Sequence, residues 1–221
     1  MPIKSSTLFW APAVLLGLCL LGLIIPGLVD FTLWMVQENH PVELLTFISL
    51  FTGGVLGIKL AIYNRQHQLD WWIWTFQLLF SLALLFVAME EIAWGQWFFG
   101  FETPAAFKKI NYQGETTLHN IPGLHGRTEI LRVIFGFGGL IGLALNWFPR
   151  FKPIAVPQVL WLWFIIIASH ASIDYYNDNY PIDKHFDWVV MWSSEFLEMM
   201  IGFAGFLYIF LHWKNRKQII R

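Results

Sequence analysis

Six long apolar segments occupy most of the sequence and leave little chain for any other structure. They cover residues 8–29, 44–63, 71–99, 128–147, 154–176 and 188–213. A hydrocarbon core about 30 Å thick needs about 20 apolar residues for one helical crossing, so each segment is long enough to span a membrane. The sequence therefore predicts an all-α, polytopic membrane helix bundle of about six transmembrane helices, folded as a single integral membrane domain over residues 1–221.

Composition agrees with a lipid environment and excludes several classes of protein. Charged residues make up 13% of the chain and hydrophobic residues 57%, whereas soluble domains carry about 25% charged residues. A net charge of −1 provides no basic surface, so we expect no nucleic-acid partner. The single cysteine, Cys19, excludes a disulfide framework and a cysteine-based zinc site. The expected partners are the lipid bilayer and a lipid-like substrate, and the oligomeric state is left open.

Basic residues predict how the bundle is oriented. Nine Lys and Arg residues lie at the termini and the even-numbered loops, and five lie on the other side. Cytoplasmic loops are enriched in Lys and Arg, so both termini are expected in the cytoplasm and the protein in the cell (inner or plasma) membrane. Glycines are expected where helices approach closely, at Gly53, Gly54 and Gly57 in the second span and Gly136, Gly138, Gly139 and Gly142 in the fourth.

An extended outer loop, residues 100–127, joins the third and fourth spans. Thr103 and Pro104, followed by Ala105, Ala106 and Phe107, predict the N-cap and first turn of a short helix. The mixture of apolar and polar residues is consistent with a loop at the membrane interface or one folded over the outer end of the bundle. Ordered loops of this length are commonly functional lids.

Ionisable residues lie within several of the predicted spans, although each costs about 2.5 to 3.5 kcal/mol at the centre of a membrane helix. At a rise of 1.5 Å per residue, Glu91 lies about 12 Å from the outer end of its span, His170 about 9 Å and Glu195 about 10 Å. This common depth predicts one site in the outer leaflet.

Glu90 and Glu91 are the predicted acid–base pair of this site, with His119 of the outer loop as a third catalytic residue. Two neighbouring carboxylates in a medium of low dielectric constant cannot both be charged cheaply. One is therefore expected to hold a proton near neutral pH, as a general acid or base must.

The remaining span residues predict a metal site. His170 and Asp174 are spaced i, i+4, and Glu195 and Glu198 are spaced i, i+3, so each pair shares a helix face. These four residues are the predicted ligands of a divalent metal, either zinc or a di-metal centre, which would activate water. The structural alternatives are pairing of Glu195 and Glu198 with Arg132 and Arg127, and a local His170–Asp174 hydrogen bond.

The six residues from Glu90 to Gly95 are similar to the Glu-Glu motif of membrane-embedded prenyl-protein proteases, in which a Glu activates water and later helices supply His. Only His170 matches such a His, and the second His helix is missing. The alkaline ceramidases, which place His and Asp around zinc, share the idea of the site, but their paired His motif is absent. No family is assigned.

Three functions are compatible with these features. The first is a membrane-embedded hydrolase, with or without a metal, acting on a lipid or lipid-linked substrate. The second is a proton- or cation-coupled transporter, and the third is a structural or assembly subunit whose acids pair helices. The hydrolase is favoured because the acids share one depth, whereas a transport path should continue with polar residues towards the cytoplasm.

Overall fold

The computed structural model describes residues 5–111, 114–118, 121–122 and 128–219, and these are helical apart from turns and connecting loops. Six of the helical stretches are long and apolar enough to cross a membrane: Ser5–Ile24, Val29–Gln66, Trp71–Glu91, Glu129–Trp147, Gln158–Asn179 and Lys184–Lys217. By length and composition the chain is a multi-pass helical membrane protein, as predicted. The cytoplasmic location of the termini and the identity of the membrane stay predictions.

Nine α-helices and four short 3-10 turns make up the described chain. The α-helices are α1 (Ser5–Ile24), α2 (Val29–Val36), α3 (Pro41–Gln66), α4 (Trp71–Glu91), α5 (Gln96–Phe99), α6 (Ala105–Lys108), α7 (Thr128–Ala144), α8 (Trp161–Asn179) and α9 (Lys184–Ile219). The 3-10 turns are η1 (Ala93–Gly95), η2 (Leu145–Trp147), η3 (Pro149–Phe151) and η4 (Gln158–Leu160).

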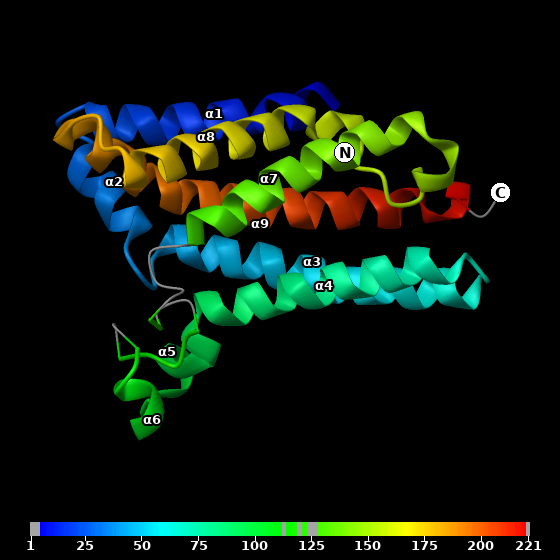
Figure 1. The fold of residues 1–221 in the computed structure, drawn as a ribbon, viewed down its shortest axis with the longest axis horizontal. Helices are drawn as coiled ribbons and strands as arrows, with labels where there is room; N and C mark the ends of the chain where they lie inside the picture. The colour runs from blue at the N-terminus through cyan, green and yellow to red at the C-terminus, as the bar shows by residue number, and fades with distance from the viewer. Residues whose placement is uncertain (1–4, 112–113, 119–120, 123–127, 220–221) are drawn as a thin grey trace.

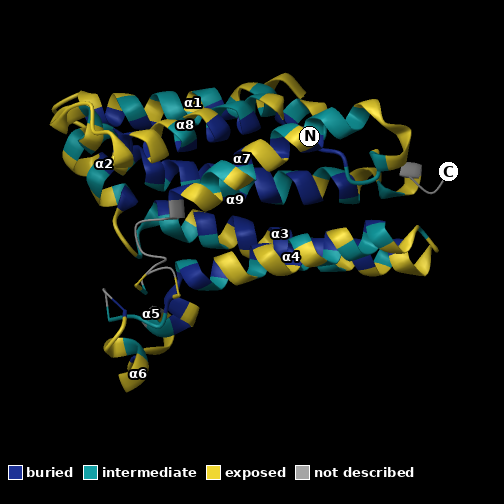
Figure 2. Ribbon diagram, in the orientation of Figure 1, coloured by how far each residue is buried: buried dark blue, intermediate teal, exposed yellow. Residues whose placement is uncertain are grey.

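Helix α9 is the centre of the bundle (Figures 1 and 2). It packs against α1, α3 and α8, while α4 packs on α3 and α7 packs on α8. Leu197, Met200, Ala204 and Ile209 of α9 are completely buried. Burying a side chain of this size stabilises the fold by about 1.5 to 3 kcal/mol in water, but lipid removes most of this driving force, so close packing must hold the helices together.

Glycines provide that close packing, as expected from the sequence. A Cβ atom at Gly136 would lie 2.7 Å from the backbone of Ala168, so α7 and α8 touch through their main chains. A Cβ atom at Gly57 of α3 would collide with the Ser81 side chain of α4. The prediction was wrong for Gly138, since nothing lies within 4 Å of the corresponding position. This glycine faces away from the helix contact.

We call the end of the bundle at which α4 finishes the loop end (Figure 1). Here α3, α7 and α9 begin and α4 and α8 end, whereas α1 begins and α9 finishes at the opposite end (Figure 1). The short helix α6 confirms the prediction for residues 105–107, but Thr103 does not cap it, because Pro104 occupies that position.

The first turn of α9 is capped by the preceding residue. The Asp183 carboxylate accepts hydrogen bonds from the backbone N–H groups of His185 at 2.8 Å and Phe186 at 3.1 Å. The N–H groups of Phe186 and His185 hold the pKa of this exposed carboxyl below its ordinary value. The cap fixes where the longest helix of the bundle begins.

Candidate functional site

Glu90 and Glu91 face different surroundings at the end of α4. Glu90 is buried, and its carboxylate accepts hydrogen bonds from the Trp94 indole and the Leu118 backbone N–H, each at 2.7 Å. Glu91 instead interacts electrostatically with Glu198, Glu43 and Glu195, which belong to α9 and α3. Glu91 is therefore the member of the pair that faces the bundle interior, and Glu90 holds the loop.

Four glutamates from three helices converge at the loop end. We call Glu43 of α3, Glu91 of α4, and Glu195 and Glu198 of α9 the acid cluster, because their carboxylates lie near enough to interact electrostatically. The common membrane depth expected for Glu91, His170 and Glu195 stays a prediction. Neither Glu91 nor Glu195 forms a hydrogen bond or ion pair within the described part of the chain.

Arg132 provides positive charge beside the acid cluster. Its Nη2 lies 3.0 Å from Asp174 Oδ2 of α8, and its Nη1 lies 3.5 Å from Glu198 Oε1 of α9. The Arg132 and Asp174 side chains are only 11% and 7% exposed, whereas Glu198 is 31% exposed. Charges this deeply buried must be paired to be tolerated. Arg132 therefore pairs with two acids, although its single positive charge balances only one of them, and it joins α7, α8 and α9.

His170 lies on α8 one turn before Asp174 but does not bind it. Its Nε2 lies 2.7 Å from the hydroxyl oxygen of Ser193 on α9, and Nδ1 is buried without a hydrogen-bond partner among the described residues. The predicted local His170–Asp174 hydrogen bond is therefore wrong, because Asp174 pairs with Arg132 and His170 reaches across to α9.

The third predicted span is interrupted directly after Glu91. The sequence predicts one helix over 71–99, but α4 ends at Glu91 and η1 follows. Ala93, Trp94 and Gly95 have φ angles of +45°, +57° and +86°. Only glycine adopts this left-handed region freely, so Ala93 and Trp94 are held in costly conformations. Such strain is found most often next to functional sites.

The outer loop is attached to the end of α4 by polar side chains. Gln96 donates from Nε2 to Thr103 Oγ1 at 2.7 Å and accepts from the Thr116 N–H at 3.1 Å. Thr103 in turn donates to the Gly114 carbonyl at 2.6 Å. Together with the Glu90 bond to Leu118, these contacts hold residues 103–111 and 114–118 at the end of α4.

The structure does not assemble the predicted metal site. No group of three or more His, Cys, Asp or Glu side chains is placed to hold a metal ion, as far as the described residues show. Three of the predicted ligands, His170, Asp174 and Glu198, already bind Ser193 or Arg132. The predicted catalytic residue His119 lies outside the described residues, as does Arg127. The metal and His119 assignments stay predictions.

Glu43 is the site residue that the sequence did not reveal. The second span was expected to begin at residue 44, which left Glu43 in a loop, whereas α3 begins at Pro41. Proline is favoured in the first turn of a helix because its missing N–H has no helical acceptor there. Pro41, two residues before Glu43, is the sequence signal that could have placed Glu43 on the helix.

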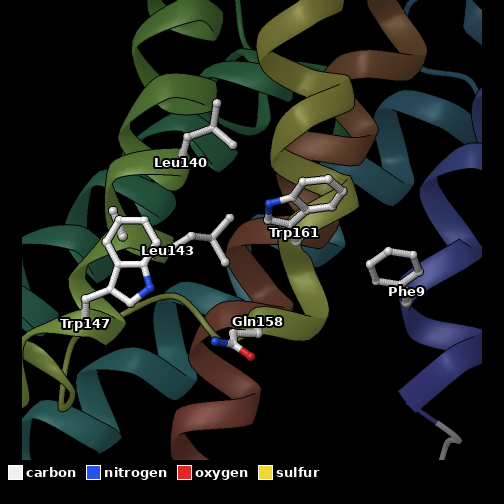
Figure 3. Close-up of a pocket in the computed structure, with 7 residues that line it drawn as sticks. Phe9, Leu140, Leu143, Trp147, Gln158 and Trp161 are labelled. Atoms are coloured by element: carbon white, nitrogen blue, oxygen red, sulfur yellow. The ribbon is translucent and has the colours of Figure 1, made fainter.

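A cavity of about 540 Å³ lies at the opposite end of the bundle, away from the acid cluster (Figure 3). It opens between α1, the end of α7 and the start of α8, and Gln158 is its one polar lining side chain among the described residues. The other lining residues are Phe9, Leu140, Leu143, Ala144, Trp147 and Trp161. Its apolar walls contribute nothing to the chemistry of the acid cluster.

Comparisons with known proteins do not place the chain in a family. No protein-family model matches it, and no curated protein or solved structure matches it. The function proposed below therefore rests on the arrangement of the side chains at the loop end.

Proposed function

We propose that this multi-pass membrane protein is a membrane-embedded hydrolase acting on a lipid or lipid-linked substrate at the loop end. The observation that carries the proposal is that the acids near the loop end differ in whether they have a structural partner. Asp174 and Glu198 pair with Arg132, and Glu90 holds the loop, but Glu91 and Glu195 have no such partner within the described chain. Carboxylates kept in an apolar bundle without a structural partner are expected to serve function.

The chemistry assigned to these residues is general acid–base catalysis. In the proposed reaction Glu91 accepts a proton from a water molecule as the water oxygen attacks an ester, amide or phosphate. A proton passes from the acid cluster to the leaving group as its bond breaks, so the products are an acid and an alcohol or amine. Mutual repulsion among four carboxylates favours keeping a proton in the cluster, which prepares both steps.

Arg132 is assigned a positioning role. It fixes Glu198 on the side of the cluster facing α7 and α8, and it supplies positive charge next to Glu195. Three of the four residues predicted to bind a divalent metal contact other side chains, and the metal stays a prediction. We derive no step through a metal.

Proton- or cation-coupled transport is the second candidate, and one observation favours it. Asn64 of α3 donates to Gln77 of α4 at 2.7 Å, and both side chains are completely buried towards the opposite end. A transport path would need to join this pair to the acid cluster. The interval between them contains the buried apolar side chains Leu50, Leu84 and Ala88 and also the buried hydroxyl side chains Thr46, Ser49 and Ser81. Each of these hydroxyls donates to a carbonyl of its own helix, so we favour the hydrolase. A structural subunit would account for Arg132 but not for Glu91.

The test uses the full chain in lipid nanodiscs, supplied with vesicles of phosphatidylethanolamine and phosphatidylglycerol and with a lipid extract of the expressing membrane. Products are followed by mass spectrometry. The Glu91→Gln variant should fold and lose product formation, while the matched variant Glu102→Gln, at an exposed loop acid, should retain it.

Two results would overturn the proposal. The first is product formation by Glu91→Gln at the rate of the unmodified chain. The second is an absence of products together with proton uptake into proteoliposomes that is lost in Glu91→Gln, a result that would establish the transporter instead.

A further inference from the structure

The segment that follows α4 has its apolar side chains outside and its polar side chains inside. We call residues 93–111 and 114–118 the loop lobe. Phe99 is 82% exposed, and the other large apolar side chains exposed on the lobe are Trp94, Phe98, Phe101, Ile110 and Leu118. A segment surrounded by water would bury such side chains, so this number of exposed apolar side chains on one short segment points to an interaction site.

The interior of the loop lobe is built from hydrogen-bonded polar groups. Thr103, Asn111 and Thr117 are buried. Asn111 donates from Nδ2 to the Thr117 carbonyl at 2.8 Å, and Thr103 bonds to Gly114 and Gln96. Backbone and polar groups next to lipid must be satisfied internally, because hydrocarbon offers no hydrogen bonds. The loop lobe meets this requirement although it is not a helix.

The apolar surface of the loop lobe continues the lipid-facing surface of α4. The Trp94 ring packs edge-on against Phe86, with centroids 5.9 Å apart and planes at 72°. Phe86 belongs to a stripe of exposed apolar side chains at helical spacing along α4, namely Phe76, Leu79, Leu82, Phe86 and Val87. Glu90 fixes the indole in this position by accepting its N–H. No polar residue separates the α4 stripe from Trp94 in this contact.

The loop lobe also has the position and charge of an interfacial segment. It extends sideways from the end of α4, across the long axis of the bundle, and exposed residues cover much of it (Figures 1 and 2). Lys108 and Lys109 are exposed at its end, beside a single exposed acid, Glu102, with which Lys108 pairs at 3.3 Å. Aromatic rings with neighbouring lysines are characteristic of segments lying between headgroups and acyl chains.

We propose that the loop lobe lies in the membrane interface, with Phe99 and its apolar neighbours in the outermost acyl region and Lys108 and Lys109 among the headgroups. The occupant of this surface is membrane lipid, because the surface continues that of a transmembrane helix at the depth where the helix ends. The inference holds whatever chemistry the acid cluster performs. Of the two arrangements expected from the sequence, a loop at the membrane interface and a loop folded over the outer end of the bundle, the proposal favours the first.

The experiment measures the depth of single fluorophores in nanodiscs. An environment-sensitive NBD label is attached to Phe99→Cys, and its quenching by acyl-brominated phospholipid is compared with that of Glu102→Cys in the same loop and Leu79→Cys on the lipid-facing side of α4. Native Cys19 is 1% exposed, so the unmodified chain serves as the labelling control. The label at 99 should be quenched to nearly the extent of the label at 79, and severalfold more than the label at 102.

A label at 99 that emits as in water and is quenched no more than the label at 102 would overturn the proposal. A second result would also overturn the proposal: the label at position 99 is shielded from aqueous quenchers in native membranes but is not quenched by brominated lipid in nanodiscs. A protein partner would then cover the surface. Removing anionic lipid should release the lysines but leave Phe99 quenched. Loss of Phe99 quenching in zwitterionic nanodiscs would contradict an apolar anchor.

Discussion

Removing Arg132 should destabilise the bundle because it leaves a buried carboxylate without its cation. In Arg132→Met, Asp174 keeps a side chain that is only 7% exposed and loses its partner at 3.0 Å. Breaking a buried ion pair from one side costs about 3 to 5 kcal/mol. Glu198 is more exposed, at 31%, so solvent screens its part of the loss. We therefore expect a loss of about 3 kcal/mol in the free energy of unfolding, at the lower end of the buried-pair range.

The double variant Arg132→Met, Asp174→Leu should recover most of this loss, since replacing both charges with apolar groups is often close to neutral. The free energies are measured by steric trapping in bicelles, with Lys109→Met as a control at an exposed loop position, expected to change stability by less than about 0.5 kcal/mol. The reasoning is refuted if Arg132→Met is as stable as the unmodified chain. It is also refuted if the double variant is no more stable than the single one.

Three further predictions concern the packing of α7, the attachment of the loop and the cap of α9. Gly136→Ala should lower the free energy of unfolding by about 1 to 3 kcal/mol through overpacking against the α8 backbone. Gly138→Ala on the same helix should be neutral or slightly stabilising. Equal effects of the two variants in the same unfolding assay would contradict the assigned contact. Glu90→Gln keeps one acceptor oxygen instead of two, so amide hydrogen exchange should accelerate at residues 114–118 and not within α3 or α9. Asp183→Ala should speed exchange in the first turn of α9, and Asp183→Asn should do so less. Because the pKa of Asp183 is lowered in the folded protein, its ionised cap contributes fully above the ordinary carboxyl pKa. The contribution is lost as the pH falls through the lowered folded pKa. Amide exchange in the first turn of α9, corrected for its intrinsic pH dependence, should therefore rise only in that acidic range.

The transmembrane helices could be predicted because length and apolarity alone determine whether a segment spans a bilayer. The break after Glu91 could not, because Ala93 and Trp94 carry no local preference for positive φ and the following residues are as apolar as the helix before them. Their conformation depends on Glu90 holding Trp94 and Leu118, which are separated from it by 4 and 28 positions. Such contacts are set by tertiary packing.

The sequence indicates which acids share the candidate site but not how their side chains are arranged. Counting residues from the helix ends placed Glu91 and Glu195 together, because helical rise is nearly constant. It could not decide which of Glu90 and Glu91 faces inwards, since rotation about the helix axis depends on the neighbouring helices. The partner of His170 was missed for the same reason, because Ser193 belongs to another helix.

The length of α9 has a consequence for how the bilayer acts on the protein. At about 1.5 Å per residue its 36 residues extend about 54 Å, well beyond a hydrocarbon core of about 30 Å. Glu195 and Glu198 lie towards one end of this rod, and Lys214, Arg216 and Lys217 lie at the other. A long helix accommodates a thinner bilayer by tilting. We therefore expect the distance between the carboxylates on α9 and those on α3 and α4 to change when a thinner bilayer changes the tilt of α9.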